Sequence, residues 1–368
     1  MVKSSGKIMA LLTASSFILT GCSILLERDY SHITPHNPAP TTEGDPSTLR
    51  ADSYQELVNA LIYFIATGTE KGTIRLYMDS DQIEADLEAA CLEVVQEDPL
   101  GAYAVEYIKY GLTSVVSYSE ATIHLTYRRT KSQINSIIQA TGVTAIRNEL
   151  STSMASFQPE CVLRISYFDE DESLIHQLAQ QAYHNAPDSA LGMPEVQVTI
   201  YPSSPSGGKQ RIVEILLTYP LDPGELERQK ADLDRWLDAL STQFMLSSSG
   251  PLLDAAHALS TSGSYDPEGG STAYSLMTEG RANSEGFALA MAALGQRFGL
   301  GCQVVSGTRD GQPHFWNVVQ TTTGRQHLDL TAPAGDDFHL YTDQELSQLG
   351  YQWDAETLLQ YVAVGKQP

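Results

Sequence analysis

Two kinds of hydrophobic periodicity follow each other along the first half of the chain. In residues 54–68 the apolar side chains recur every three or four positions, which is typical of a helix with one buried face. In residues 72–78 they alternate with polar ones, which is typical of a strand. The pattern then predicts a second helix, a connection and two further strands, at residues 82–96, 98–105, 111–119 and 121–129. The order of elements is αβαββ.

The same order of elements appears a second time. We predict a second helix, strand, helix, connection and pair of strands. In this order they lie at residues 145–157, 161–168, 173–185, 187–193, 195–202 and 210–220. Arg75-Leu76-Tyr77 matches Arg164-Ile165-Ser166, and Thr126-Tyr127 matches Thr218-Tyr219. We therefore predict a duplicated α+β region in which helices cover one face of each sheet. A chance likeness between two ordinary α+β stretches is the alternative.

The last third of the chain contains a helix that is apolar on nearly every side. It follows a long amphipathic helix at residues 222–244 and a short one at 252–259. From Ser284 onward, apolar residues recur at spacings of three and four with alanines between them, namely Phe287, Met291, Leu294 and Phe298. A helix without a polar face is a buried helix, and Gly299 is placed to end it.

Three strands are predicted after this helix, at residues 302–307, 314–320 and 325–331, with a hairpin joining the last two. Alternation puts His314 and Trp316 on one face of the second strand and Asp329 on one face of the third. Depending on the register, Asp329 lies opposite His314 or opposite Trp316, one diagonal step away. If the two faces coincide, the carboxylate can reach the imidazole, orient it and favour its charged form.

Composition indicates a globular protein and argues against a nucleic-acid partner. Of 368 residues, 42% are hydrophobic and 18% charged, which suffices for two ordinary domains. Acidic residues outnumber basic ones by 45 to 22, so the surface should repel nucleic acid and anionic lipid. Cys91, Cys161 and Cys302 stand in apolar segments and are expected to be buried, unreactive thiols. Because there is no C-x-x-C pair and no His/Cys cluster, we predict neither a metal site nor a cofactor.

The chain begins with a targeting segment, which is excluded from the fold. Lys3 and Lys7 precede an apolar run, 8–19, that is too short to span a bilayer as a stable helix. The run ends in Leu19-Thr20-Gly21-Cys22, which resembles a bacterial lipobox. The resemblance implies that residues 1–21 are a lipoprotein signal peptide and that Cys22 carries a lipid at the extracytoplasmic face of a bacterial membrane. A plain secretory signal with a chance Cys is the alternative.

Domain boundaries follow from these patterns. Residues 22–50 are rich in Pro and poor in apolar side chains, so we expect a disordered tether. The two α+β modules are placed at 51–130 and 131–221, and a last domain at 222–368.

Three motifs in the last domain carry a family resemblance. They are S-E-G-F at 284–287, H-F-W-N at 314–317 and H-L-D-L-T at 327–331. They resemble the C-E-G-Y, H-A-W-N and H-V-D-V-T motifs of the bacterial transglutaminase-like superfamily, over roughly residues 252–349. The resemblance implies a papain-like α+β fold and, in active members, a Cys-His-Asp triad. By position, Ser284 stands where the family has its nucleophilic Cys, His314 where it has the base, and Asp329 where it has the orienting acid.

Ser284 departs from the family at the nucleophile. In the family a helix N-terminus and an imidazolium lower the pKa of the thiol, so that a thiolate attacks an amide carbonyl. A hydroxyl cannot be ionised in advance in this way, since its proton must leave during the attack. Ser284 also has a non-catalytic alternative, because Asn283 or Ser284 could cap the helix that starts here.

The expected function follows from this substitution. We expect a membrane-anchored lipoprotein with an inactive transglutaminase-like domain that binds a peptide, a protein or a cell-wall component, or serves as a scaffold. Tyr274, Phe287 and Trp316 are expected to line its cleft. The alternatives are a working Ser-His-Asp amide hydrolase or acyl-transferase on the same fold, and a purely structural surface protein. Cys302 is a poor substitute nucleophile because it begins a strand and not a helix.

Overall fold

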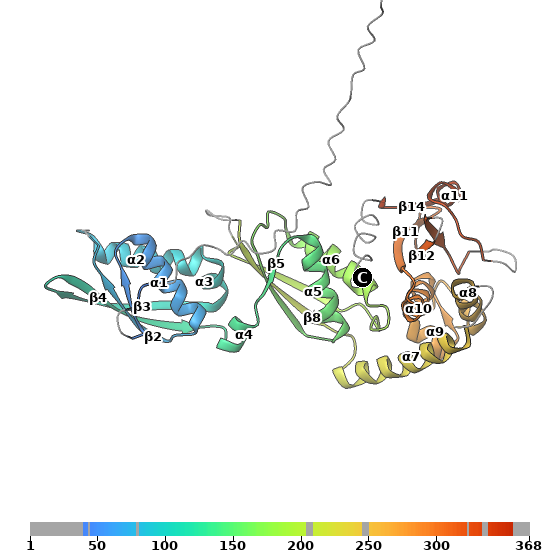
Figure 1. The fold of residues 1–368 in the computed structure, drawn as a ribbon, viewed down its shortest axis with the longest axis horizontal. Helices are drawn as coiled ribbons and strands as arrows, with labels where there is room; N and C mark the ends of the chain where they lie inside the picture. The colour runs from blue at the N-terminus through green and yellow to red at the C-terminus, as the bar shows by residue number, and fades with distance from the viewer. Residues whose placement is uncertain are drawn as a thin grey trace, which may run out of the picture. The chain divides into compact units, whose positions relative to one another are not determined.

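The computed structural model describes residues 40–42, 45–78, 81–203, 209–244, 250–321, 324–332 and 338–355 (Figure 1). The chain forms two units, Met1–Pro35 and His36–Pro368. The predicted signal peptide, Cys22 and most of the tether lie outside the described residues. The described helices and strands all belong to the second unit.

The first part of this unit is a four-stranded sheet with helices. Its elements are β1 (Thr48–Ala51), α1 (Tyr54–Thr67), β2 (Lys71–Leu76), α2 (Ile83–Gln96), α3 (Pro99–Ala104), β3 (Val105–Val115) and β4 (Tyr118–Tyr127). The strand order is β1-β2-β4-β3, with β1 parallel to β2 and the other neighbours antiparallel. Every second residue of β2 is buried, and Ile74 and Leu76 pack with Leu57 and Phe64 of α1 in one core.

The second part repeats this plan. Its elements are α4 (Lys131–Asn135), β5 (Ile138–Ala140), α5 (Val143–Ala155), β6 (Glu160–Ile165), α6 (Glu172–Asn185), β7 (Glu195–Tyr201) and β8 (Arg211–Thr218). The strand order is β5-β6-β8-β7, again with only the first pair parallel. The order of strands and the direction of each pair are therefore the same in both sheets.

In the first half of each copy the elements repeat at a constant spacing. Helix α1 begins at Tyr54 and α5 at Val143, while α2 begins at Ile83 and α6 at Glu172, so the offset is 89 positions in both cases. At the same offset, Ala51 pairs with Leu76 in the first sheet and Ala140 pairs with Ile165 in the second. The predicted repeated αβ sheets are present in the structure.

Each copy has one strand more than predicted. Strands β1 and β5 have four and three residues, which is too short for a period to be detected. Strand β1 also corrects the tether, which was placed at 22–50, because Thr48 already belongs to the sheet and Leu49 and Ala51 are buried. Strand β3 begins at Val105, inside the predicted connection; most of its residues are exposed, and Ile108, Tyr110 and Leu112 alternate as the half-buried ones on the core.

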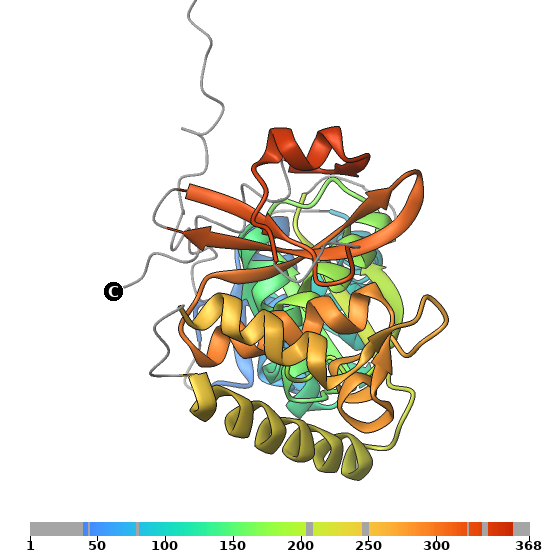
Figure 2. The same ribbon diagram turned by 90° about the vertical axis from the view of Figure 1, so that its right-hand side faces the viewer.

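The third part surrounds one buried helix, α10 (Ser284–Arg297). The other elements are α7 (Pro223–Phe244), α8 (Pro251–Ser262), β9 (Ser264–Tyr265), α9 (Ala273–Glu279), β10 (Arg281–Ala282), β11 (Cys302–Arg309), β12 (Gln312–Thr321), β13 (Gly324–Leu328), α11 (Asp343–Gln348) and β14 (Tyr351–Trp353). An antiparallel sheet with the order β13-β12-β11-β14 lies on one side of α10, and α7 lies on the other (Figure 2). The burial predicted for α10 from its apolar circumference is confirmed.

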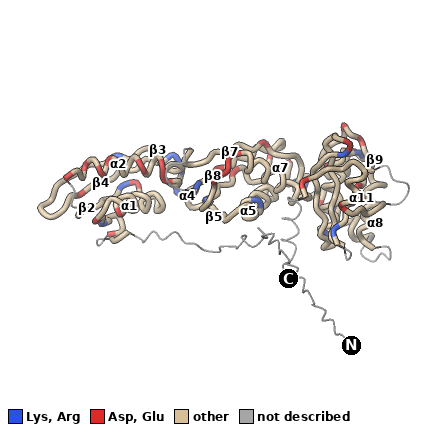
Figure 3. The backbone as a smooth tube through the Cα atoms, turned by 90° about the horizontal axis from the view of Figure 1, so that it is seen from above, with Lys and Arg blue, Asp and Glu red and all other residues tan. Residues whose placement is uncertain are grey.

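Charged residues are spread over the whole of this unit. Asp and Glu side chains occur in all three parts, and they outnumber Lys and Arg (Figure 3). None of the helices in the described ranges has both the length and the apolar character needed to cross a bilayer.

Candidate functional site

The N-terminus of α10 is held by a side-chain cap. Asn283 Oδ1 accepts the backbone N–H groups of Glu285 at 3.0 Å and Gly286 at 3.1 Å. Asn283, and not Ser284, is therefore the cap, and the capping alternative for the Ser284 hydroxyl is wrong. Satisfying otherwise free N–H groups in this way typically contributes about 1 kcal/mol.

Gly286 is required where the helix starts. A Cβ at this position would lie 2.8 Å from Ala282 Cβ and 2.9 Å from the carbonyl oxygen of Gly270. Asn283 N–H in turn donates to the Gly270 carbonyl at 3.1 Å, which fixes the loop against the helix. The Gly of S-E-G-F thus has a packing reason, and it places Ser284 on the first turn of a closely held helix.

The Ser284 hydroxyl faces the start of β12. Its Oγ accepts the backbone N–H of Phe315 at 3.3 Å, and the residue is 8% exposed. Phe315 follows His314 in β12, so the Ser284 hydroxyl contacts the backbone next to the predicted base. Within the described residues, no hydrogen bond joins the Ser284 hydroxyl to the His314 ring.

His314 and Asp329 form a buried pair. His314 Nε2 lies 2.7 Å from Asp329 Oδ2, and the two residues are 6% and 5% exposed. The last pair of the β12–β13 ladder is Asn317 with Leu328, so Asp329 follows directly after β13 and would continue the ladder opposite Trp316. The diagonal arrangement is the one adopted, and the two side chains share a face.

Asp329 is surrounded by donors. Tyr351 O–H donates to Oδ2 at 2.6 Å, while the Thr331 N–H and hydroxyl donate to Oδ1 at 2.8 and 2.7 Å. Burial raises the pKa of this carboxyl, but the hydrogen bonds from His314, Tyr351 and Thr331 together outweigh it and leave the pKa below its ordinary value. Asp329 is therefore a carboxylate at neutral pH and can hold the imidazole in one orientation.

Tyr351 is a site residue that the sequence did not reveal. It comes from β14, in a tail for which no chemistry was predicted, and β14 pairs with β11 rather than with β12. Burial, followed by the charge of Asp329, raises the pKa of Tyr351, so its hydroxyl stays protonated as a donor. No motif spacing points to this residue, because only the sheet order brings it to Asp329.

A second imidazole, that of His327, lies against Trp316, as the His314 ring does. Trp316 Nε1–H donates to His327 Nδ1 at 3.0 Å, and His327 Nε2 lies 3.0 Å from Asp343 Oδ1. These contacts match a neutral imidazole with its proton on Nε2. Burial lowers the pKa of His327 and outweighs the opposing effect of Asp343.

The residues expected to line a cleft are packed instead. Trp316 is 1% exposed and Phe287 3%, because Trp316 packs with Tyr351 in a small core and Phe287 belongs to the main core around α10. Tyr274 on α9 is half-buried against that main core. Two cavities in the described part of the chain, of about 280 and 320 Å³, are lined by other residues, and neither includes Ser284, His314 or Asp329.

Asn317 joins the sheet to the helix that carries Ser284. Its Nδ2 donates to the carbonyl oxygen of Ala288 at 2.8 Å, and the residue is fully buried. The last residue of H-F-W-N therefore ties β12 to α10, the helix that begins with Ser284.

The cysteines with described positions are all buried. Burial raises the pKa of the Cys91 and Cys302 thiols to about 12, and it also raises that of Cys161. Cys302 lies beneath α10, where its thiol contacts the Met291 carbonyl, and this position does not suit a nucleophile. Among the described residues, no group of three or more His, Cys, Asp or Glu side chains is placed to hold a metal ion.

Comparisons with known proteins give little beyond this geometry. No family model matches the chain, and no curated protein matches it. One solved structure, titled "Crystal structure of a TGase", is similar to it at a TM-score of 0.27 and 13% identity, covering 65% of this chain and 68% of that one. A likeness at this TM-score does not establish a shared fold.

Proposed function

We propose that residues 222–368 form a transglutaminase-like domain whose catalytic machinery is incomplete, and that it works as a binding or scaffold module. The observation that carries the proposal is the state of the Ser284 hydroxyl. It accepts the Phe315 N–H and makes no hydrogen bond to His314 among the described residues, while His314 is already held by Asp329. A serine nucleophile needs a base that takes its proton during the attack, and that contact is missing.

The retained His–Asp pair favours one alternative. Asp329 is buried, ionised and fully hydrogen-bonded, which is the arrangement that a Ser-His-Asp amide hydrolase or acyl-transferase needs in its orienting acid. A substrate that drew the Ser284 hydroxyl toward His314 would complete such a triad. This is the second candidate function.

The proposed setting is the extracytoplasmic face of a bacterial membrane. The lipobox-like sequence ending at Cys22 supports a lipid anchor there, with a peptide, a protein or a cell-wall component as ligand. The acidic balance of 45 to 22 supports a partner other than nucleic acid.

Restoring the thiol tests the family assignment. In Ser284→Cys the sulfur would stand at a helix N-terminus and accept the Phe315 N–H, and each of these lowers the pKa of a thiol. We expect iodoacetamide to alkylate this variant at pH 7 much faster than the wild-type protein, whose other cysteines give the background rate.

Adding His314→Ala to Ser284→Cys tests whether the imidazole activates the new thiol. If the imidazole activates the thiol, this second change slows alkylation to the background rate. Equal rates for Ser284→Cys and for the wild-type protein would contradict the assignment, since the position would then lack the environment of a nucleophile.

A further inference from the structure

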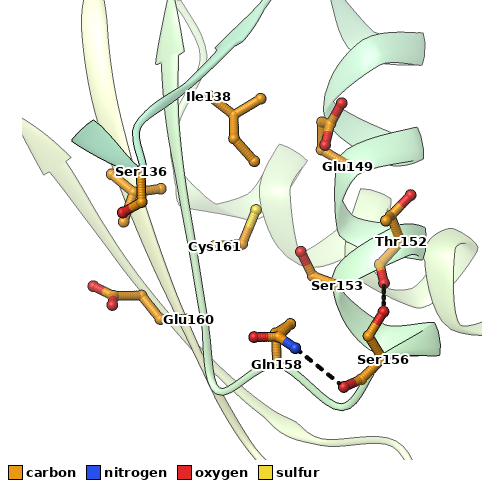
Figure 4. A pocket seen from close by; sticks show the side chains of 10 residues that line it. Ser136, Ile138, Glu149, Thr152, Ser153, Ser156, Gln158, Glu160 and Cys161 are labelled. Atoms are coloured by element: carbon orange, nitrogen blue, oxygen red, sulfur yellow. Dashed lines mark hydrogen bonds between the residues drawn. The ribbon is translucent and has the colours of Figure 1, made fainter. Parts of the chain in front are cut away.

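A cavity of about 280 Å³ lies in the second α+β copy, between α5 and the start of β6 (Figure 4). Cys161 stands at its centre, with Ser153 beside it on α5 and Ile138 across from it on β5. Strand β5 pairs only with residues 163–165, so it does not cover the start of β6. The cavity is therefore open along the edge of the sheet.

The first copy shows what fills this place when the core is complete. At the offset of 89 residues, Ser153 corresponds to Phe64 and Cys161 corresponds to Gly72. Phe64 is fully buried, and its ring lies over Gly72 so closely that a Cβ there would be 2.4 Å from the ring. The second copy has a hydroxyl in place of this phenyl ring and a thiol in place of Gly72, while Phe157, the counterpart of Gly68, adds a buried ring elsewhere in the same core.

Other residues around the cavity are also more exposed or more polar than their counterparts in the first copy. Leu49 and Ala60 are both fully buried in the first copy, and their counterparts are Ile138, which is 36% exposed, and Glu149, which is partly exposed. A core position and its surroundings have thus become a cavity with a polar rim. The polar rim gives a bound molecule partners for its polar groups, which the loss of the ring alone would not provide.

Size and charge define the class of ligand. A cavity of roughly 150 Å³ is enough to hold benzene, so 280 Å³ admits one aromatic ring and a short substituent. The lining contains two carboxylates, Glu149 and Glu160, and no Lys or Arg. Glu149 lies one helical turn from Ser153 on the same face of α5, which places a negative charge next to the ring position.

We propose that this cavity is a binding site for an aromatic ammonium group, as in an arylalkylamine or an aromatic side chain next to a free amino group. The ring occupies the cavity beside Ser153 and Cys161, and the ammonium group pairs with Glu149. The proposal is independent of the function proposed for the last domain.

The probe is benzylammonium, titrated into the full chain and followed by calorimetry or by NMR. Saturable binding to the wild-type protein is expected. It should disappear in Ser153→Phe/Cys161→Gly, which rebuilds the packing of the first copy; both changes are needed because Phe64 tolerates only a glycine beneath it. A melting curve for this variant no lower than that of the wild type shows that the refilled core is folded.

Two results would overturn the proposal: no saturable binding to the wild type, or unchanged binding in the refilled variant. Glu149→Gln tests the charge. It should weaken benzylammonium about tenfold and leave benzyl alcohol unchanged, and an equal effect on both probes would contradict the ion pair.

Discussion

At the scale of single residues, hydrogen bonds decide which protonation states the site can have. Asp329 accepts from His314, Tyr351 and Thr331, and it remains ionised although it is buried. The base position is thus fully supported, while the nucleophile position carries an oxygen that accepts a backbone N–H. The proposed loss of catalytic activity is therefore due to the Ser284 side chain and not to the residues that hold His314.

His327 makes stability depend on pH. Its Nδ1 must stay unprotonated to accept Trp316 Nε1–H, and burial lowers its pKa below 6.5 in the folded state. As the pH falls through 6.5, the unfolded chain therefore takes up a proton that the folded chain does not, and stability is lost. We expect a slope of at most about 1.4 kcal/mol per pH unit from this group, measured by urea denaturation between pH 5 and 8.

His327→Gln is the matched control. A neutral amide can accept from Trp316 and donate to Asp343 at every pH in this range. The variant should lose the part of the slope that His327 contributes. Identical slopes for the wild-type protein and His327→Gln would show that this imidazole does not set the pH dependence.

At the scale of elements, the start of α10 depends on a glycine. Replacing Gly by Ala inside a helix usually adds about 1 kcal/mol of stability. Gly286→Ala should do the opposite, because the new methyl group meets two backbone carbonyl oxygens, those of Gly270 and Thr272, at 2.9 and 3.0 Å. We expect a net loss of about 1–2 kcal/mol in denaturant unfolding.

Gly111→Ala gives the comparison for this effect. Gly111 lies in β3, and a Cβ there would have no heavy atom within 4 Å. That substitution should be close to neutral. A Gly286→Ala variant as stable as Gly111→Ala would contradict the close packing at the helix start.

The two copies also differ at the end of their first helices. Gly68 ends α1 with φ +67°, and its counterpart Phe157 follows α5 with φ +52°, in the left-handed region. Phe157 is retained because its ring is buried and packs edge-on against Tyr219, with centroids 5.8 Å apart. Losing such a ring costs about 3–5 kcal/mol, which exceeds the roughly 1 kcal/mol of backbone strain.

Two variants separate these contributions. Phe157→Ala loses the ring and keeps the strain, whereas Phe157→Gly loses the ring and relieves it. Both variants should be less stable than the wild type. The free energy of unfolding of the Gly variant should be about 1 kcal/mol higher than that of the Ala variant, measured by thermal or denaturant unfolding. A Gly variant that is less stable than the Ala variant would contradict the left-handed backbone at this position.

The sequence predicted the elements whose periodicity depends on burial. The repeat, α10, the strand that carries His314 and the strand that leads to Asp329 follow from alternation and helical spacing, because each packs on a core. It could not predict β1 or β5, which are too short, nor the contact of Tyr351 with Asp329, which depends on strand order. The sequence also did not predict the burial of Trp316 and Phe287, which were expected to line a cleft, because aromatic side chains near a site suit a packed core equally well.

At the scale of the whole molecule, partly buried polar contacts join the parts of the described unit. Arg129, just after β4, places Nη2 at 2.6 and 2.8 Å from the two carboxylate oxygens of Glu214 in β8, and Tyr201 O–H donates to the same carboxylate at 3.0 Å. In the same way, His184 on α6 lies 2.9 Å from Glu285 of the S-E-G-F motif. The motif residue next to Ser284 therefore contacts the second copy.

Removing one member of the Arg129–Glu214 pair should be costly. The Glu214 side chain is 7% exposed and that of Arg129 is 23%, so Glu214→Gln leaves a largely buried cation without its partner. We expect a loss of about 3 kcal/mol in denaturant unfolding. The double variant Arg129→Met/Glu214→Gln should lose less than the sum of its single changes, and strict additivity would show that the pair is not coupled.

The central claim is that Ser284 does not act as a nucleophile, and a fluorophosphonate probe measures this directly. Such probes react covalently with a serine only where a base activates its hydroxyl. We predict that the wild-type protein is labelled no more than Ser284→Ala at neutral pH. Labelling of the wild-type protein that disappears in both Ser284→Ala and His314→Ala would contradict this claim and establish a working Ser-His-Asp triad.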